Sequence, residues 1–253
     1  MKNQTKRDNS FFFAYTAILL VIVFTGFAPS LFLRTAFDTP PIPPYLYLHG
    51  LILTAWFLLL IFQAWLIRKN HTKLHKKLGY FIAAYGVFVI VGGLMATSNT
   101  VARGFGGAVF LDTDMADIDP SMGAGISYLE FISGVVWANL AAMITFAVML
   151  GSAIFFRRKS DIHKRLILIA TVAIVGPALA RIARLELLGG EQGLFLPTTI
   201  FLLLAAIIIH DFLTLGKAHR ASLAGAGFLI IVFLTSLAVA RTEFGLEFVR
   251  GLA

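Results

Sequence analysis

Histidine, tryptophan and glutamine recur at seven-residue intervals along one long apolar segment. His49, Trp56 and Gln63 therefore share one stripe of a helix. Polar side chains inside a membrane cost free energy unless they are paired, so the stripe is expected to face protein or a cavity, not lipid. Because histidine titrates near neutral pH, such a stripe could bind a quinone, another ligand or a proton. The alternative is packing between helices, with His49 and Trp56 at the membrane interface.

A second candidate site lies at the expected outer face of the membrane, provided that the helices carrying it adjoin. Its members are His49, Gln63, Glu130, Arg181 and Arg184. Such a pocket could bind an anionic head group, a heme propionate or a quinone oxygen. In the alternative, Glu130 pairs with Arg181, and Arg184 extends to the interface. His49 needs a hydrogen-bond partner, and Glu130 and Arg181 are the candidates at its depth.

Small residues follow His75 along one face of the next expected helix. Gly79, Ala83, Gly86 and Gly93 form a groove on that face. Either another helix packs into the groove, or a flat ring lies in it with His75 as a ligand.

A later expected helix carries His163 at one end and Arg181 at the other. Pro177 between them predicts a kink and a freed backbone carbonyl near the middle of that helix.

Metal chemistry has few candidate ligands in this sequence. The chain contains no cysteine, which excludes disulfides, thiolate metal sites and iron–sulfur clusters. His210 and Asp211 are the candidate ligands for a divalent metal, at a depth near His75 and His163. Their spacing matches no closed metal motif, and the neighbouring lysines repel a cation.

The elements that position these side chains follow from composition. The chain has 253 residues, of which 58% are hydrophobic and 13% are charged, and its mean hydropathy is +0.86. Charged residues make up about a quarter of an ordinary soluble domain, so the sequence predicts an all-α, polytopic membrane protein. The net charge of +8 arises from short turns between apolar segments, which argues against binding of nucleic acid.

Seven transmembrane helices in a single helical-bundle domain, residues 1–253, are expected. The predicted spans are residues 11–33, 45–68, 78–98, 128–156, 166–185, 196–215 and 223–240. The long segment 99–127 is glycine-rich and acidic, and we interpret it as a solvated loop. Fifteen of the 21 lysines and arginines fall on one side, which predicts a cytoplasmic N-terminus and an outside C-terminus.

Three basic turns resemble one another. Each places a histidine just before a basic residue at the start of a helix: Lys73-Leu-His75-Lys, Asp161-Ile-His163-Lys and Lys217-Ala-His219-Arg. The helices around them would then be three related hairpins that follow the first helix. A recurring topology anchor explains the same pattern without common descent.

Three segments carry a resemblance to known proteins: HGLILTAWFLLLIFQ, LHKKLG and DIHKRLILIATVAIVGP. With them the sequence resembles a group of uncharacterised bacterial multi-pass membrane proteins, which implies the bacterial inner (plasma) membrane. The order of its histidines is also distantly similar to that in b-type cytochromes, the transmembrane electron carriers: His49-Gly50 early in one helix, Lys73-Leu-His75 at the start of the next, and His163 at the start of a third. That similarity implies heme b, with His75 and His163 as its pair of ligands. His49 has no such partner, because the fourth helix offers Glu130 and no histidine.

Two classes of function remain open on this basis. The first is a redox-associated membrane protein that binds heme or quinone, motivated by His75, His163 and the outer residues. The second is a non-catalytic accessory or assembly subunit that packs against other membrane subunits, motivated by 24 phenylalanines and few buried ionisable groups. A small-solute transporter is a weaker third, because no pair of broken spans marks a midplane site.

Overall fold

The computed structural model of the chain describes residues 2–37, 41–103, 114, 117, 125–185 and 192–252. Every regular element in this part of the chain is helical, and one isolated β-bridge joins Asp114 to Ser127. Six of the described helices are long and apolar enough to cross a membrane, and a bent pair makes a seventh if it counts as one span. The predicted multi-pass, all-α architecture is confirmed. Most of the acidic segment 112–119 lies outside the described residues.

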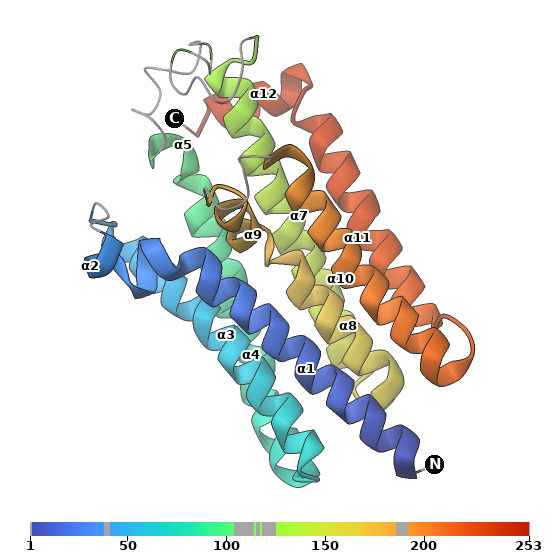
Figure 1. Ribbon diagram of the computed structural model, residues 1–253. Coiled ribbons are helices and arrows are strands. Elements are labelled where there is room, and N and C mark those ends of the chain that lie inside the picture. Colours follow the sequence, from blue (N-terminus) through green and yellow to red (C-terminus); the bar gives the residue numbers. More distant parts are fainter. Residues whose placement is uncertain are drawn as a thin grey trace.

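The long helices form an elongated bundle (Figure 1). The long or bent spans are α1 Lys2–Phe27, α3 Pro44–Arg68, α4 Thr72–Ser98, α7 Tyr128–Phe155, α8 Ser160–Ala173, α9 Gly176–Ile182, α10 Gln192–Leu215 and α11 Arg220–Val239. The short elements are η1 Ala28–Phe32, α2 Arg34–Phe37, α5 Thr100–Arg103 and α12 Glu243–Arg250. The bundle packs around α7, which contacts α4, α8, α11 and α12.

The two ends of the bundle differ in charge. The α3–α4, α7–α8 and α10–α11 turns lie at the end that carries the N-terminus, and the C-terminus lies at the opposite end (Figure 1). Basic side chains gather in these turns, among them Lys69, Arg158, Lys159 and Lys217. We call this the basic end. Its assignment to the cytoplasm remains a prediction, as do the single domain and the kinship of the hairpins.

The fifth predicted span is broken where the sequence indicates. Helix α8 ends at Ala173 and α9 begins at Gly176, and the two axes differ by 48°. Pro177 has no amide hydrogen to donate and its ring crowds the preceding turn, so the chain bends just before it. The predicted kink is confirmed, although α8 begins at Ser160, ahead of the expected start at residue 166.

Near both ends of the chain the structure contains helical residues that the hydropathy pattern does not predict. Helix α1 begins at Lys2, ahead of the expected start at residue 11. At the opposite end, α12 packs on α7, where the Trp137 indole donates to the Gly245 carbonyl at 3.2 Å. Apolar windows find spans, whereas α12 is amphipathic and packs on α7, and near the start of α1 the polar Asp8 pairs with Lys164.

The small-residue groove of α4 is filled by another helix along most of its length. A Cβ added at Gly86 would collide with Leu150, and one at Gly93 with Met143, both of α7. At Gly79, one turn from His75, an added Cβ would meet no atom within 4 Å. Helix packing therefore explains the groove at Gly86 and Gly93, and open space remains beside His75.

Close packing of α1 on α9 generates a first prediction. An added Cβ at Gly26 would lie 2.8 Å from the Cα of Ala178, a backbone atom that cannot turn aside. We expect Gly26→Ala to lower the free energy of unfolding by about 1–3 kcal/mol through overpacking. Gly151→Ala is the matched control, because nothing lies within 4 Å of its added Cβ and alanine favours the helix. Equal unfolding temperatures of the two variants in detergent would contradict the packing.

Candidate functional site

Two histidines from different helices meet at the basic end. His75 lies in the first turn of α4 and His163 in the first turn of α8. Their ring centroids are 6.4 Å apart, and the ring planes cross at 83°. The structure thus brings together the two side chains that the resemblance to b-type cytochromes pairs as ligands.

Backbone carbonyls fix how these two rings present their nitrogens. His163 Nδ1 lies 2.9 Å from the Ala153 carbonyl oxygen, which can only accept, so Nδ1 carries the hydrogen and Nε2 keeps a lone pair. The Nδ1 atom of His75 is buried without a hydrogen-bond partner among the described residues. The ring also lies within hydrogen-bonding reach of the Gln63 main chain. His163 Nε2 and His75 Nδ1 are thus the ring nitrogens without a hydrogen-bond partner among the described residues.

The polar stripe of α3 faces protein, as predicted. Trp56 is 1% exposed, and its indole nitrogen donates to the Thr171 hydroxyl of α8 at 3.3 Å. Gln63 is 8% exposed, and neither its amide nitrogen nor its amide oxygen has a partner among the described residues. An unpaired buried amide costs about 1–3 kcal/mol, which makes Gln63 a candidate position for binding a ligand or water.

The residues expected at the outer pocket contact different elements. His49 Nδ1 is buried on the side of α4, 3.6 Å from where a Cβ on Gly92 would lie. Glu130 closes a capping box with Ser127 at the start of α7. The guanidinium of Arg181 lies 4.4 Å from the centre of the Phe27 ring, and Arg184 is exposed. His49 faces the bundle, but these contacts do not join the set into one pocket, which stays a prediction.

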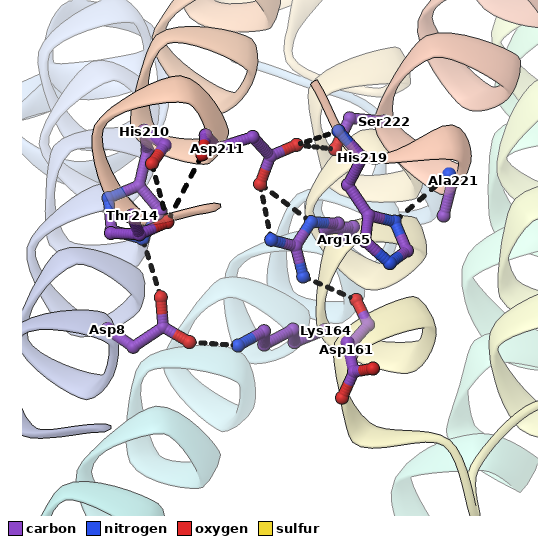
Figure 2. Close-up of polar contacts among 10 residues, drawn as sticks. All are labelled: Asp8, Asp161, Lys164, Arg165, His210, Asp211, Thr214, His219, Ala221 and Ser222. Atoms are coloured by element: carbon purple, nitrogen blue, oxygen red, sulfur yellow. Dashed lines mark hydrogen bonds and ion pairs between the residues drawn. The ribbon is translucent and has the colours of Figure 1, made fainter. Parts of the chain in front are cut away.

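A buried ion pair occupies the position of the candidate metal ligand Asp211. Arg165 is 1% exposed and Asp211 is 0% exposed. Arg165 donates to Asp211 Oδ1 through Nε at 2.8 Å and also through Nη2. The other carboxylate oxygen accepts the Ser222 hydroxyl at 2.5 Å and the His219 amide at 3.1 Å. Figure 2 shows this network, which ties α8 to α10 and α11.

A second set of charges lies beside the first and reaches α1. Asp8 accepts from Lys164 through one oxygen, and its other oxygen lies 2.7 Å from His210 Nε2 (Figure 2). The His210 ring also stacks on Phe11 with centroids 3.8 Å apart. His210 and Asp211 are thus both bonded to other side chains of the protein. The described residues contain no group of three or more metal-ligating side chains.

Sequence reasoning missed four members of these networks: Asp8, Lys164, Arg165 and Ser222. We interpreted the two basic residues as turn charges that set topology. The sequence does contain a signal for this pairing. Asp211 lies within an apolar helix, and a buried carboxylate requires a cation. Arg165 lies one turn inside α8, which makes it the candidate cation.

The surroundings of His219, which lies in the α10–α11 turn outside the spans, shift its pKa. Burial lowers the pKa of His219, and the nearby positive charge of Arg165 lowers it further, while Asp211 and Asp161 oppose the shift. The neutral ring accepts from the Ala221 amide at 3.1 Å and so caps α11. Protonation would remove that acceptor and place a positive charge at a helix N-terminus.

Comparison with protein-family profiles, curated sequences and solved structures gives no significant match.

The buried pair generates a second prediction. Asp211→Asn keeps the shape but leaves the Arg165 charge uncompensated, which should cost about 3–5 kcal/mol of unfolding free energy. Glu247→Gln is the control, because that exposed carboxylate lies 3.6 Å from Arg250 and such pairs contribute about 1 kcal/mol or less. Denaturant titration of the purified protein measures both. Similar midpoints for the two variants would exclude a structural role for the pair.

A third prediction concerns pH. Because the folded pKa of His219 is lowered, the unfolded chain takes up this proton first as the pH falls below about 6.5. Stability should be full above that pH and decrease as the pH approaches the folded pKa. His219→Asn retains a capping acceptor but cannot titrate, so its unfolding temperature should fall less between pH 7.5 and 5. Parallel profiles for the two proteins would contradict this role.

Proposed function

We propose that this chain is a redox-associated integral membrane protein that holds heme b at its basic end, with His75 and His163 as the iron ligands. The observation that carries the proposal is their approach from α4 and α8, with ring centroids 6.4 Å apart and one nitrogen of each ring available. Histidine pairs from separate helices are an established means of holding heme iron. The bound heme would supply one-electron transfer.

The surroundings of the two rings fit such a group. The hydrogen bond from His163 Nδ1 to Ala153 orients the ring and raises the basicity of Nε2, as is usual for histidine ligands. His75 Nδ1 is buried without a partner among the described residues, and beside it the Cβ position of Gly79 is open. A ligand there would satisfy an atom that otherwise loses hydration without compensation.

The chain's own residues have separate tasks in this proposal. His75 and His163 bind the iron, and the Ala153 carbonyl orients one of them. The exposed Lys76 and Lys77 follow His75 in α4, where their charges complement heme carboxylates. The apolar body of the bundle limits access of water from the membrane side.

Quinone binding is the second candidate, and Gln63 favours it. A quinone accepts hydrogen bonds and a quinol donates them, and the unpaired Gln63 amide offers both a donor and an acceptor. An accessory-subunit role has support only from the exposed apolar surface, which lipid also covers. A transporter site is usually built from two broken helices, whereas the described residues contain one broken pair, α8 and α9.

The fourth prediction is spectroscopic. The full-length protein, purified in mild detergent with added hemin, should show a Soret band that shifts on reduction. His75→Ala and His163→Ala should each lose most of the shift, because each removes one iron ligand. His71→Ala is the matched control, since His71 is an exposed histidine four residues before His75.

Absence of a Soret band would overturn the heme proposal. A lipid extract would then decide the second candidate, because quinone that copurifies with the protein but not with Gln63→Leu would support it. Quinone at equal levels in both would overturn it.

A further inference from the structure

A groove of about 860 Å³ opens at the basic end, between α7, α8 and α11. Neither of the proposed heme ligands lines it, and no step of the proposed function uses it. Its walls are apolar and come from three helices: Met149 and Phe156, Ile162 and Leu166, and Phe228. A groove with such walls, in a chain that crosses the membrane, suits a hydrocarbon chain.

Small residues on α11 line one side of the groove. A Cβ added at Gly225 would lie 2.6 Å from Ile169 Cδ1 and 3.5 Å from Leu166 Cδ2, so α11 approaches α8 closely there. Ala224 is exposed beside it and leaves the groove open along its length. A larger side chain at Ala224 would fill the groove.

The mouth of the groove is positively charged. Lys217 and Arg220 line it and are exposed, and within the described part of the chain neither has an ion-pair partner. No carboxylate lines the groove. The nearby Asp211 is buried against Arg165, and the Asp161 side chain accepts from Ser160 at 3.2 Å. The two cations are therefore free to bind an anion.

The dimensions match a molecule with a charged head and an apolar tail. From Arg220 to Phe228 the groove follows α11 for about 12 Å, at a rise of about 1.5 Å per residue. Lys217 lies in the α10–α11 turn and Arg220 is the first residue of α11, at the end of the span where lipid head groups are expected, and the apolar wall continues along the helix. An inorganic anion would leave this wall without a role.

We propose that the groove binds an anionic phospholipid from the leaflet at the basic end. Lys217 and Arg220 bind the phosphate, and one acyl chain lies along Met149, Leu166 and Phe228. Charged side chains that meet an anionic head group contribute attraction, and burial of the acyl chain adds a term in proportion to the apolar area.

The test compares two lipids on the full-length protein. The purified protein in neutral detergent is titrated with dioleoyl phosphatidylglycerol and with dioleoyl phosphatidylcholine, and binding is followed by the rise in unfolding temperature. Phosphatidylglycerol should bind more tightly. The double variant K217Q/R220Q should weaken that binding about 25-fold, since each cation near an anionic lipid is worth about a factor of five, with phosphatidylcholine binding unchanged.

Two further variants separate the groove from general surface charge. K69Q/K73Q removes two exposed lysines at the same end, one that follows α3 and one in the first turn of α4, and should leave lipid binding unchanged. Ala224→Phe keeps both cations but fills the groove, so binding of phosphatidylglycerol should be lost. Soluble glycerol phosphate should give no stabilisation, because it has no acyl chain.

Four results would overturn the proposal: equal affinity for the two lipids, an equal loss in K69Q/K73Q, full binding by Ala224→Phe, or equal stabilisation by glycerol phosphate. Heme content plays no part in this readout, so failure of the proposed function leaves the test valid.

Discussion

The buried pair of Arg165 and Asp211 is the interaction on which the basic end depends. The apolar faces of α8, α10 and α11 leave their relative depth undefined, because sliding one helix along another changes hydrophobic burial little. A carboxylate that accepts from Arg165, Ser222 and the His219 amide has one arrangement in which all its bonds form. Loss of any of these partners leaves a buried charge or donor unsatisfied, so the network fixes the register of three helices.

Polar groups elsewhere in the bundle divide into satisfied and unsatisfied ones. Trp56 reaches Thr171, and the Tyr15 hydroxyl donates to the Leu203 carbonyl at 2.7 Å. Gln63 and His75 Nδ1 are buried without such partners among the described residues. Two adjacent groups without a partner in the described part of the chain place an energetic cost at one location, which is the physical reason for proposing a ligand there.

The basic end concentrates the chemistry of the chain. The His75–His163 pair, the Arg165 network and the cationic groove all lie near the three basic turns, while Glu130 and Arg181 at the opposite end serve a helix cap and an aromatic contact. Charges are least costly near a membrane surface, where water and lipid head groups solvate them. The basic turns therefore also supply cations for the lipid site proposed above.

The sequence by itself determined the features that depend on local composition. Long apolar segments gave the spans, Pro177 gave the bend before α9, and the seven-residue spacing gave the protein-facing stripe of Trp56 and Gln63. The approach of His75 to His163 was also anticipated, but through resemblance. Only the tertiary structure decided that Arg165 is a buried partner and not a turn charge, because its pairing with Asp211 links residues distant in the chain. Partner choice depends on which helices adjoin, and hydropathy carries no information on that.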